Sequence, residues 1–173
     1  MTVSIFGSSR CLPSSEEYRK AHELGSLLAR EGHAVCNGGY GGTMEASARG
    51  ARENGGSTIG VTVESFGQKA NKWIQREIRM KTLPERLLKL IELGDAYIVL
   101  RGGTGTLLEL SAIWEFINKG LMPPKPFVLT DFWQPVVDLL RAELESEEAS
   151  GRYWVTVAAT PDACVKALRP LSR

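Results

Sequence analysis

Short apolar runs alternate with amphipathic segments along the whole chain. Runs of strand length occupy residues 2–6, 33–36, 57–63, 96–100, 127–129 and 153–157. Between them, apolar residues recur every three or four positions, which predicts helices over residues 14–32, 44–53, 84–93, 107–118, 132–148 and 161–168. Regular alternation of strand and helix is typical of an α/β fold. We therefore predict a Rossmann-like, doubly wound parallel sheet with helices on both faces, formed by residues 1–173 as a single domain.

Local signals refine three of these segments. Ser14 and Glu17 have capping-box spacing, so Ser14 is the expected N-cap of the first helix. Thr43 is placed to cap the second helix. Residues 64–81 show neither an apolar run of strand length nor helical spacing of apolar residues, and we expect them to form a lid or an arm.

Charge and cysteine content narrow the range of partners. Lys and Arg total 21 and Asp and Glu total 20, so the net charge of +1 predicts neither a nucleic-acid nor a membrane partner. We find no apolar run long enough for a membrane span and no signal peptide, and the three cysteines are widely spaced. These features predict a cytoplasmic protein without a metal site. Because the whole chain carries almost no net charge, any site for an anion must be formed by a few neighbouring groups.

Three strand-to-helix turns are rich in glycine and hydroxyl residues. Because parallel strands point the same way, these turns should gather at one sheet edge, where open α/β folds bind ligands. Glycine admits a close backbone approach, and amides at helix starts favour an anion. Each turn alone could simply be a tight turn; together they predict a phosphate site. Its candidate residues are Gly7, Ser8, Ser9 and Arg10; Gly38, Gly39, Gly42 and Thr43; and Gly102, Gly103, Thr104, Gly105 and Thr106.

Familiar nucleotide and hydrolase motifs are missing from these turns. The first turn lacks GxGxxG, which disfavours a dinucleotide site, and the chain contains neither GxxxxGK[ST] nor GxSxG. A P-loop NTPase and an α/β hydrolase are therefore disfavoured.

Two charged residues are candidates for chemistry near this edge. Glu109 is expected on the first turn of the helix that follows Thr106. There it either lines the ligand pocket or simply complements the helix dipole. Arg86 is either a solvated surface charge or a bidentate anion clamp, and since a guanidinium does not give up its proton it would be a poor general acid. Spacing alone does not separate these interpretations.

The stretch Arg101-Gly102-Gly103-Thr104-Gly105-Thr106-Leu107-Leu108-Glu109 resembles the LOG (LONELY GUY) family, whose pattern is P-G-G-x-G-T-x-x-E and whose members are often labelled possible lysine decarboxylases. Residues 37–44, NGGYGGTM, and residues 94–100, GDAYIVL, are similar to two further family segments. The likeness spans most of the chain, from Phe6 to about Leu140.

The resemblance implies a phosphoribohydrolase that needs no cofactor and forms a homodimer or a higher homo-oligomer. Such an enzyme cleaves the N-glycosidic bond of AMP or of N6-modified, cytokinin-like AMP, releasing the base and ribose 5-phosphate. By position, the catalytic Glu and Arg of the family correspond to Glu109 and Arg86. In this role Glu109 would stabilise positive charge at C1′ or orient water, and Arg86 would hold the nucleotide.

This chain departs from the family pattern at two positions. Arg101 replaces the proline before the glycines, and Leu87 replaces the lysine of the Arg-Lys pair. Glu45 after the second turn is more similar to the carrier branch of the superfamily, which includes molybdenum-cofactor carriers. The alternative is therefore a non-catalytic nucleotide or cofactor carrier. Lysine decarboxylation ranks far behind, because no lysine lies in a recognisable pyridoxal motif.

Overall fold

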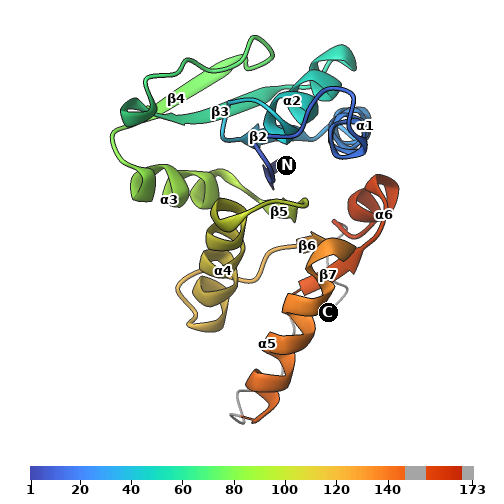
Figure 1. The fold of residues 1–173 in the computed structure, drawn as a ribbon, viewed down its shortest axis with the longest axis vertical. Helices are drawn as coiled ribbons and strands as arrows, with labels where there is room; N and C mark the ends of the chain where they lie inside the picture. Colours follow the sequence, from blue (N-terminus) through green and yellow to red (C-terminus); the bar gives the residue numbers. More distant parts are fainter. Residues whose placement is uncertain (147–154, 169–173) are drawn as a thin grey trace.

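The computed structural model describes residues 1–146 and 155–168. One parallel sheet of seven strands runs through it in the order β4-β3-β2-β1-β5-β6-β7 (Figure 1). The strands are β1 (Thr2–Phe6), β2 (Ala34–Asn37), β3 (Thr58–Val63), β4 (Arg76–Met80), β5 (Ala96–Val99), β6 (Phe127–Thr130) and β7 (Val155–Ala158). Because β2–β4 extend to one side of β1 and β5–β7 to the other, the topological switch point lies between β1 and β5. The predicted doubly wound α/β fold is confirmed.

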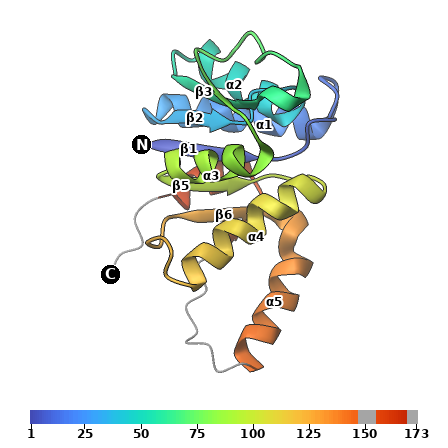
Figure 2. The same ribbon diagram turned by 90° about the vertical axis from the view of Figure 1, so that its left-hand side faces the viewer.

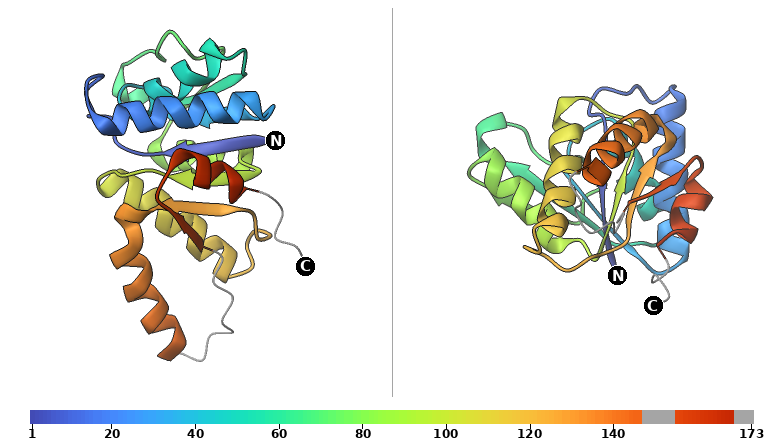
Figure 3. Two further views of the ribbon diagram at one scale, coloured as in Figure 1. Left: turned by 90° about the vertical axis from the view of Figure 1, so that its right-hand side faces the viewer. Right: turned by 90° about the horizontal axis from the view of Figure 1, so that it is seen from below.

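Helices cover both faces of the sheet, with an apolar core beneath each layer. Helices α1 (Glu16–Arg30), α2 (Thr43–Glu53) and α6 (Pro161–Lys166) pack on one face. Helices α3 (Leu83–Leu93), α4 (Thr104–Asn118) and α5 (Gln134–Ser146) pack on the other. Figure 2 shows α3 and α4 in front of the sheet, and the left view of Figure 3 shows α1 and α6 across the opposite face. Strands β1, β2, β3, β5 and β6 are mostly buried between the two helix layers, which explains their continuous apolar character.

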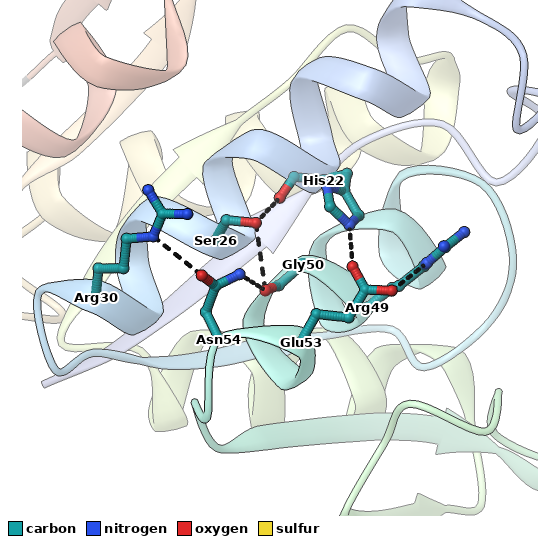
Figure 4. A network of polar contacts seen from close by, with 7 residues as sticks. All are labelled: His22, Ser26, Arg30, Arg49, Gly50, Glu53 and Asn54. Carbon is teal, nitrogen blue, oxygen red and sulfur yellow. Dashed lines mark hydrogen bonds and ion pairs between the residues drawn. The ribbon is translucent and has the colours of Figure 1, made fainter.

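Helices α1 and α2 pack unusually closely against each other. Glycines allow this approach, since a Cβ on Gly50 would lie 2.0 Å from the carbonyl oxygen of His22. The Ser26 hydroxyl donates to the same His22 carbonyl at 3.0 Å and to the Gly50 carbonyl at 3.3 Å (Figure 4). His22 Nε2 also lies 2.7 Å from Glu53 Oε2. Small residues and polar links therefore fix the α1–α2 layer.

Two helix starts differ from the prediction. Ser15, not Ser14, caps α1, because its side chain accepts a hydrogen bond from the Tyr18 amide. Thr43 is the first residue of α2 rather than its cap, and Gly42 is the N-cap. Adjacent serines and a glycine-rich turn each offer more than one possible start, so the sequence pattern was wrong by one residue in both cases.

Helix α4 begins at Thr104, three residues before the predicted start. Glu109 is consequently the sixth residue of the helix, and its expected place on the first turn is wrong. Thr104 and Gly105 are weak helix formers, which hid the first turn from a propensity argument. Glu109 therefore lies below the helix terminus, on the second turn.

The stretch 64–81, expected to be a lid or an arm, contains regular structure. A 3₁₀ helix, η1 (Glu64–Phe66), follows β3, and β4 pairs in parallel with β3, placing Ile78 opposite Val61. Charged residues occupy most of β4 because it is an edge strand, so the apolar signature of a buried strand is missing.

The predicted helix at 132–148 also begins differently, since η2 (Asp131–Trp133) precedes α5. Positions 147–148 of that predicted helix and 153–154 of the predicted last strand lie outside the described residues.

Candidate functional site

The three glycine-rich turns meet at the carboxyl edge of the sheet and are joined by backbone contacts. The Ser8 amide donates to the carbonyl of Arg101 at 3.2 Å, and the Thr43 amide donates to the carbonyl of Ser8 at 2.9 Å. A Cβ on Gly7 would lie 2.6 Å from Thr43 Oγ1, so the first turn requires glycine at this contact. The expected gathering of the turns at one edge is confirmed, whereas their phosphate binding stays a prediction.

A close backbone contact and side-chain hydrogen bonds shape the second turn. Gly42 has a φ of 65°, and a Cβ there would lie 2.3 Å from the carbonyl oxygen of Ser8. The Asn37 side chain accepts a hydrogen bond from the Gly39 amide at 2.8 Å. From the segment before β4, Asn71 Nδ2 donates to the Tyr40 carbonyl at 2.8 Å. These contacts define the backbone path of the turn.

The third turn presents the start of α4 to solvent. Gly103 is the N-cap, and no side chain of the described residues caps this helix. The amides of the first turn have no intrahelical partners, and together with the helix dipole they favour an anion. A Cβ on Gly105 would meet no described atom within 4 Å, so the turn is open. In contrast, the amide and hydroxyl of Thr43 both donate to the Ser8 carbonyl.

Arg86 and Glu109 come together on the α3–α4 face. Arg86 Nη1 lies 3.6 Å from Glu109 Oε1, and the two side chains are only 9% and 15% exposed. Arg86 Nε donates to the Val61 carbonyl at 2.8 Å, which fixes the guanidinium plane. A Cβ on Gly38 would lie 1.7 Å from Arg86 Nη2, so this glycine makes room for the guanidinium. Arg86 is therefore a buried, oriented cation rather than a solvated surface charge.

Burial dominates the electrostatics of Glu109. Desolvation raises the pKa of the Glu109 carboxyl to about 7, and the charge of Arg86 only partly opposes this rise. Near neutral pH, protonated and ionised forms of the Glu109 carboxyl therefore coexist. A group that acts as a general acid or base works best with a pKa near the working pH.

Tyr40 completes the surroundings of the guanidinium. Its ring centroid lies 5.8 Å from Arg86 Cζ, and its hydroxyl accepts a hydrogen bond from the Val63 amide at 2.9 Å. Asn71 and Tyr40 were absent from the predicted site. Tyr40 could have been found from its place inside the glycine-rich turn, whereas Asn71 carried no signal in the sequence.

Other predicted residues lie elsewhere at this edge. Ser9 and Arg10 are exposed in the first turn. Arg101 Nη1 lies 3.5 Å from Glu17 Oε1, and its guanidinium covers the Phe132 ring at 5.0 Å, on the α1 side of the sheet. Glu45 is half-buried on the first turn of α2, in the helix layer on the face opposite α3 and α4.

Within residues 1–146 and 155–168, no three His, Cys, Asp or Glu side chains form a group suited to a metal ion. Across the same residues, no helix combines the length and apolar character needed to cross a bilayer.

Comparison with known proteins links this geometry to a family. A cytokinin riboside 5'-monophosphate phosphoribohydrolase from Mycobacterium tuberculosis is 36% identical over 116 residues, covering 65% of this chain and 62% of that protein. An enzyme of the same name from Rhodococcoides fascians is 30% identical over 146 residues, 80% of this chain and 73% of its own. The chain thus spans less than two thirds of the mycobacterial relative.

A solved structure described as the molybdenum cofactor binding protein from the phototrophic bacterium Rippkaea orientalis has the same fold. It superposes with a TM-score of 0.72 at 26% identity, covering 95% of this chain and 93% of its own. The family model for LDcluster4 matches residues 1–120, which include the three glycine-rich turns, Arg86 and Glu109. The chain belongs to the SLOG cluster4 family.

Proposed function

We propose that this protein is a phosphoribohydrolase that releases the base from a purine nucleoside 5′-monophosphate, AMP or an N6-modified AMP. The observation that carries the proposal is the buried Glu109 carboxyl, with a pKa near 7, beside the fixed guanidinium of Arg86 and below the open start of α4. The names of the bacterial relatives support the same reaction class.

The dimensions of α4 suit this substrate. Glu109 is five residues beyond Thr104, which places it roughly 7–8 Å along the helix axis from the Thr104 amide. A ribose 5-phosphate can bridge such a span, with its phosphate at the helix terminus and C1′ near the carboxyl. Arg86, immobilised by the Val61 carbonyl, would hold the ribose in this orientation.

The chemistry follows from this placement. The C1′–N bond breaks, positive charge develops at C1′, and the departing base nitrogen takes up a proton from solvent, which is balanced by the proton that the attacking water gives up. Water forms the new C1′–O bond. As a carboxylate, Glu109 would stabilise the charge at C1′ and accept the proton of the attacking water.

We extend the proposal to a cytoplasmic homodimer or higher homo-oligomer. Exposed leucines lie on the neighbouring helices α3 and α4, namely Leu83, Leu88, Leu107 and Leu108. A second copy would remove this apolar surface from water next to the site. The free thiols of Cys11, Cys36 and Cys164 fit a reducing compartment. Light scattering of the purified protein should give at least twice the chain mass.

Base release from a nucleotide panel tests the proposal. Chromatography should detect free adenine and ribose 5-phosphate from AMP with the wild-type protein. Glu109→Gln should abolish release while AMP still binds. Glu115→Gln is the matched control, because Glu115 is exposed on the same helix. If the wild type releases no base from any nucleoside monophosphate, the proposal is wrong.

A carrier function is the second candidate. It is favoured by the structural similarity to the Rippkaea orientalis protein, whose description names molybdenum cofactor binding. The position of Leu87, where the LOG pattern has lysine, is consistent with binding without turnover. Calorimetry that detects tight binding of a pterin nucleotide, with no product afterwards, would support the carrier.

A further inference from the structure

A cleft opens at the same sheet edge, on the face opposite Arg86 and Glu109. Its volume is about 330 Å³, at the lower end of the range for ligand pockets. One wall is the start of α1, and the other is formed by the ends of β5 and β6 together with η2. The lining residues that carry the argument are Glu17, Lys20, Arg101, Asp131 and Phe132.

The cleft reaches the start of α4 from the α1 side. Arg101 lines it and lies two residues before Gly103, the N-cap of α4. Glu109 is on the other side of this start, within the α3–α4 layer. A nucleotide with its 5′-phosphate at α4 and its C1′ at Glu109 therefore has its base on the α3–α4 side. Such a monophosphate leaves the cleft empty.

The lining of the cleft indicates what could fill it. Glu16, Glu17 and Asp131 supply three carboxylates against the two cations Lys20 and Arg101, so a further bare anion is disfavoured. Carboxylates accept hydrogen bonds from hydroxyl groups. Phe132 is 42% exposed; the Arg101 guanidinium lies over its ring at 5.0 Å, and the rest of the exposed ring surface offers an apolar contact. This set suits an uncharged ring that carries hydroxyl groups.

We propose that the cleft binds a sugar attached beyond the 5′-phosphate, so that the preferred ligand is a nucleoside diphosphate sugar rather than a nucleoside monophosphate. This inference rests on the proposed function, which places the phosphate and C1′. The diphosphate would lie at the open start of α4, the nucleoside on the Glu109 side and the sugar against Phe132. Hydrolysis at C1′ would release the base and leave the diphosphate sugar intact.

Calorimetric titration with AMP, ADP and ADP-glucose separates the contributions of the second phosphate and the sugar. The wild-type protein should bind ADP-glucose about tenfold more tightly than ADP. Phe132→Ala should remove this advantage and leave the AMP affinity unchanged. Asp131→Asn, an exposed position in the same cleft, should weaken ADP-glucose alone if Phe132→Ala fails to fold. Leu139→Ala is the control, since Leu139 is 70% exposed on α5.

The outcomes distinguish this inference from the proposed function. If ADP-glucose binds no more tightly than ADP, or if Phe132→Ala weakens all three ligands equally, the sugar site is wrong even when AMP is hydrolysed. If the sugar advantage depends on Phe132 but no nucleotide releases adenine, the cleft stands and the hydrolase proposal fails. If none of the three ligands binds, both fail.

Discussion

The raised pKa of Glu109 has a measurable cost in stability. Its value moves from 4.5 to about 7 in the folded protein. One pKa unit corresponds to ~1.4 kcal/mol, so the ionised carboxyl destabilises the fold by roughly 3 kcal/mol relative to its protonated form. Because the carboxyl is only 15% exposed, solvent screens little of this effect.

The direction follows from proton binding. The folded state holds the proton more tightly than the unfolded state, so the contribution of the protonated carboxyl is complete below pH 4.5. As the pH rises, the unfolded chain ionises first, and the contribution is lost between 4.5 and about 7. Glu109→Gln mimics the protonated carboxyl and does not titrate. Its stability relative to wild type should therefore rise by roughly 3 kcal/mol across this interval.

Urea denaturation of both proteins at several pH values, from about 4 to about 8, measures this difference. The other titrating groups are present in both proteins, so their contributions to the free energy of unfolding cancel in the difference. Glu115→Gln removes an exposed carboxylate on the same helix, whose ion pair with Lys119 is screened by solvent, and should change the stability difference far less over this pH range. If Glu109→Gln and wild type lose stability in parallel, desolvation does not control this carboxyl, and the electrostatic argument for the site is refuted.

Three further substitutions test the packing around the site and the helix layer. Gly38→Ala places a Cβ 1.7 Å from Arg86 Nη2 and must displace the guanidinium, so base release from AMP should fall by about 100-fold in a steady-state assay. Gly50→Ala collides with the His22 carbonyl and should lower the free energy of unfolding by ~1–3 kcal/mol in urea. Tyr40→Phe leaves a buried amide of β3 without its acceptor and should cost about 1–3 kcal/mol in the same measurement.

Gly105→Ala is the stability control for these variants, because a Cβ there meets no described atom and alanine favours a helix by ~0.5–1 kcal/mol. Equal stability of Gly50→Ala and Gly105→Ala would contradict the close α1–α2 contact. Unchanged base release by Gly38→Ala would show that the position of Arg86 does not matter for the reaction.

Strand and helix periodicity was sufficient to predict the architecture. Apolar runs buried on both faces reveal central strands directly, so the parallel sheet and the common edge of the turns followed from the pattern. Strand β4 did not follow, because an edge strand shaped by Arg76, Glu77 and Arg79 has no such run. β4 can be recognised as a strand only from its pairing with β3, which is a tertiary contact and leaves no local pattern in the sequence.

The candidate site was only partly predictable for a similar reason. The sequence nominated Glu109 and Arg86, but their 3.6 Å contact depends on the room left by Gly38, 48 positions before Arg86. Desolvation of Glu109 likewise depends on how α3 and α4 pack over the sheet. Neither the contact between Arg86 and Glu109 nor the burial of Glu109 can be predicted from local sequence patterns. In addition, α4 begins earlier than predicted, so the Glu109 carboxylate lies on the second turn of the helix.

The charged edge of the sheet has a consequence for solubility. Strand β4 leaves one row of backbone donors and acceptors open, and such a row recruits further strands from other molecules. Arg76, Glu77 and Arg79 are exposed on this strand, so an approaching β-strand would have to strip water from ionised groups beside the ladder. The charges of β4 thus oppose strand addition at this edge of the sheet, and their removal should make the edge more prone to intermolecular pairing.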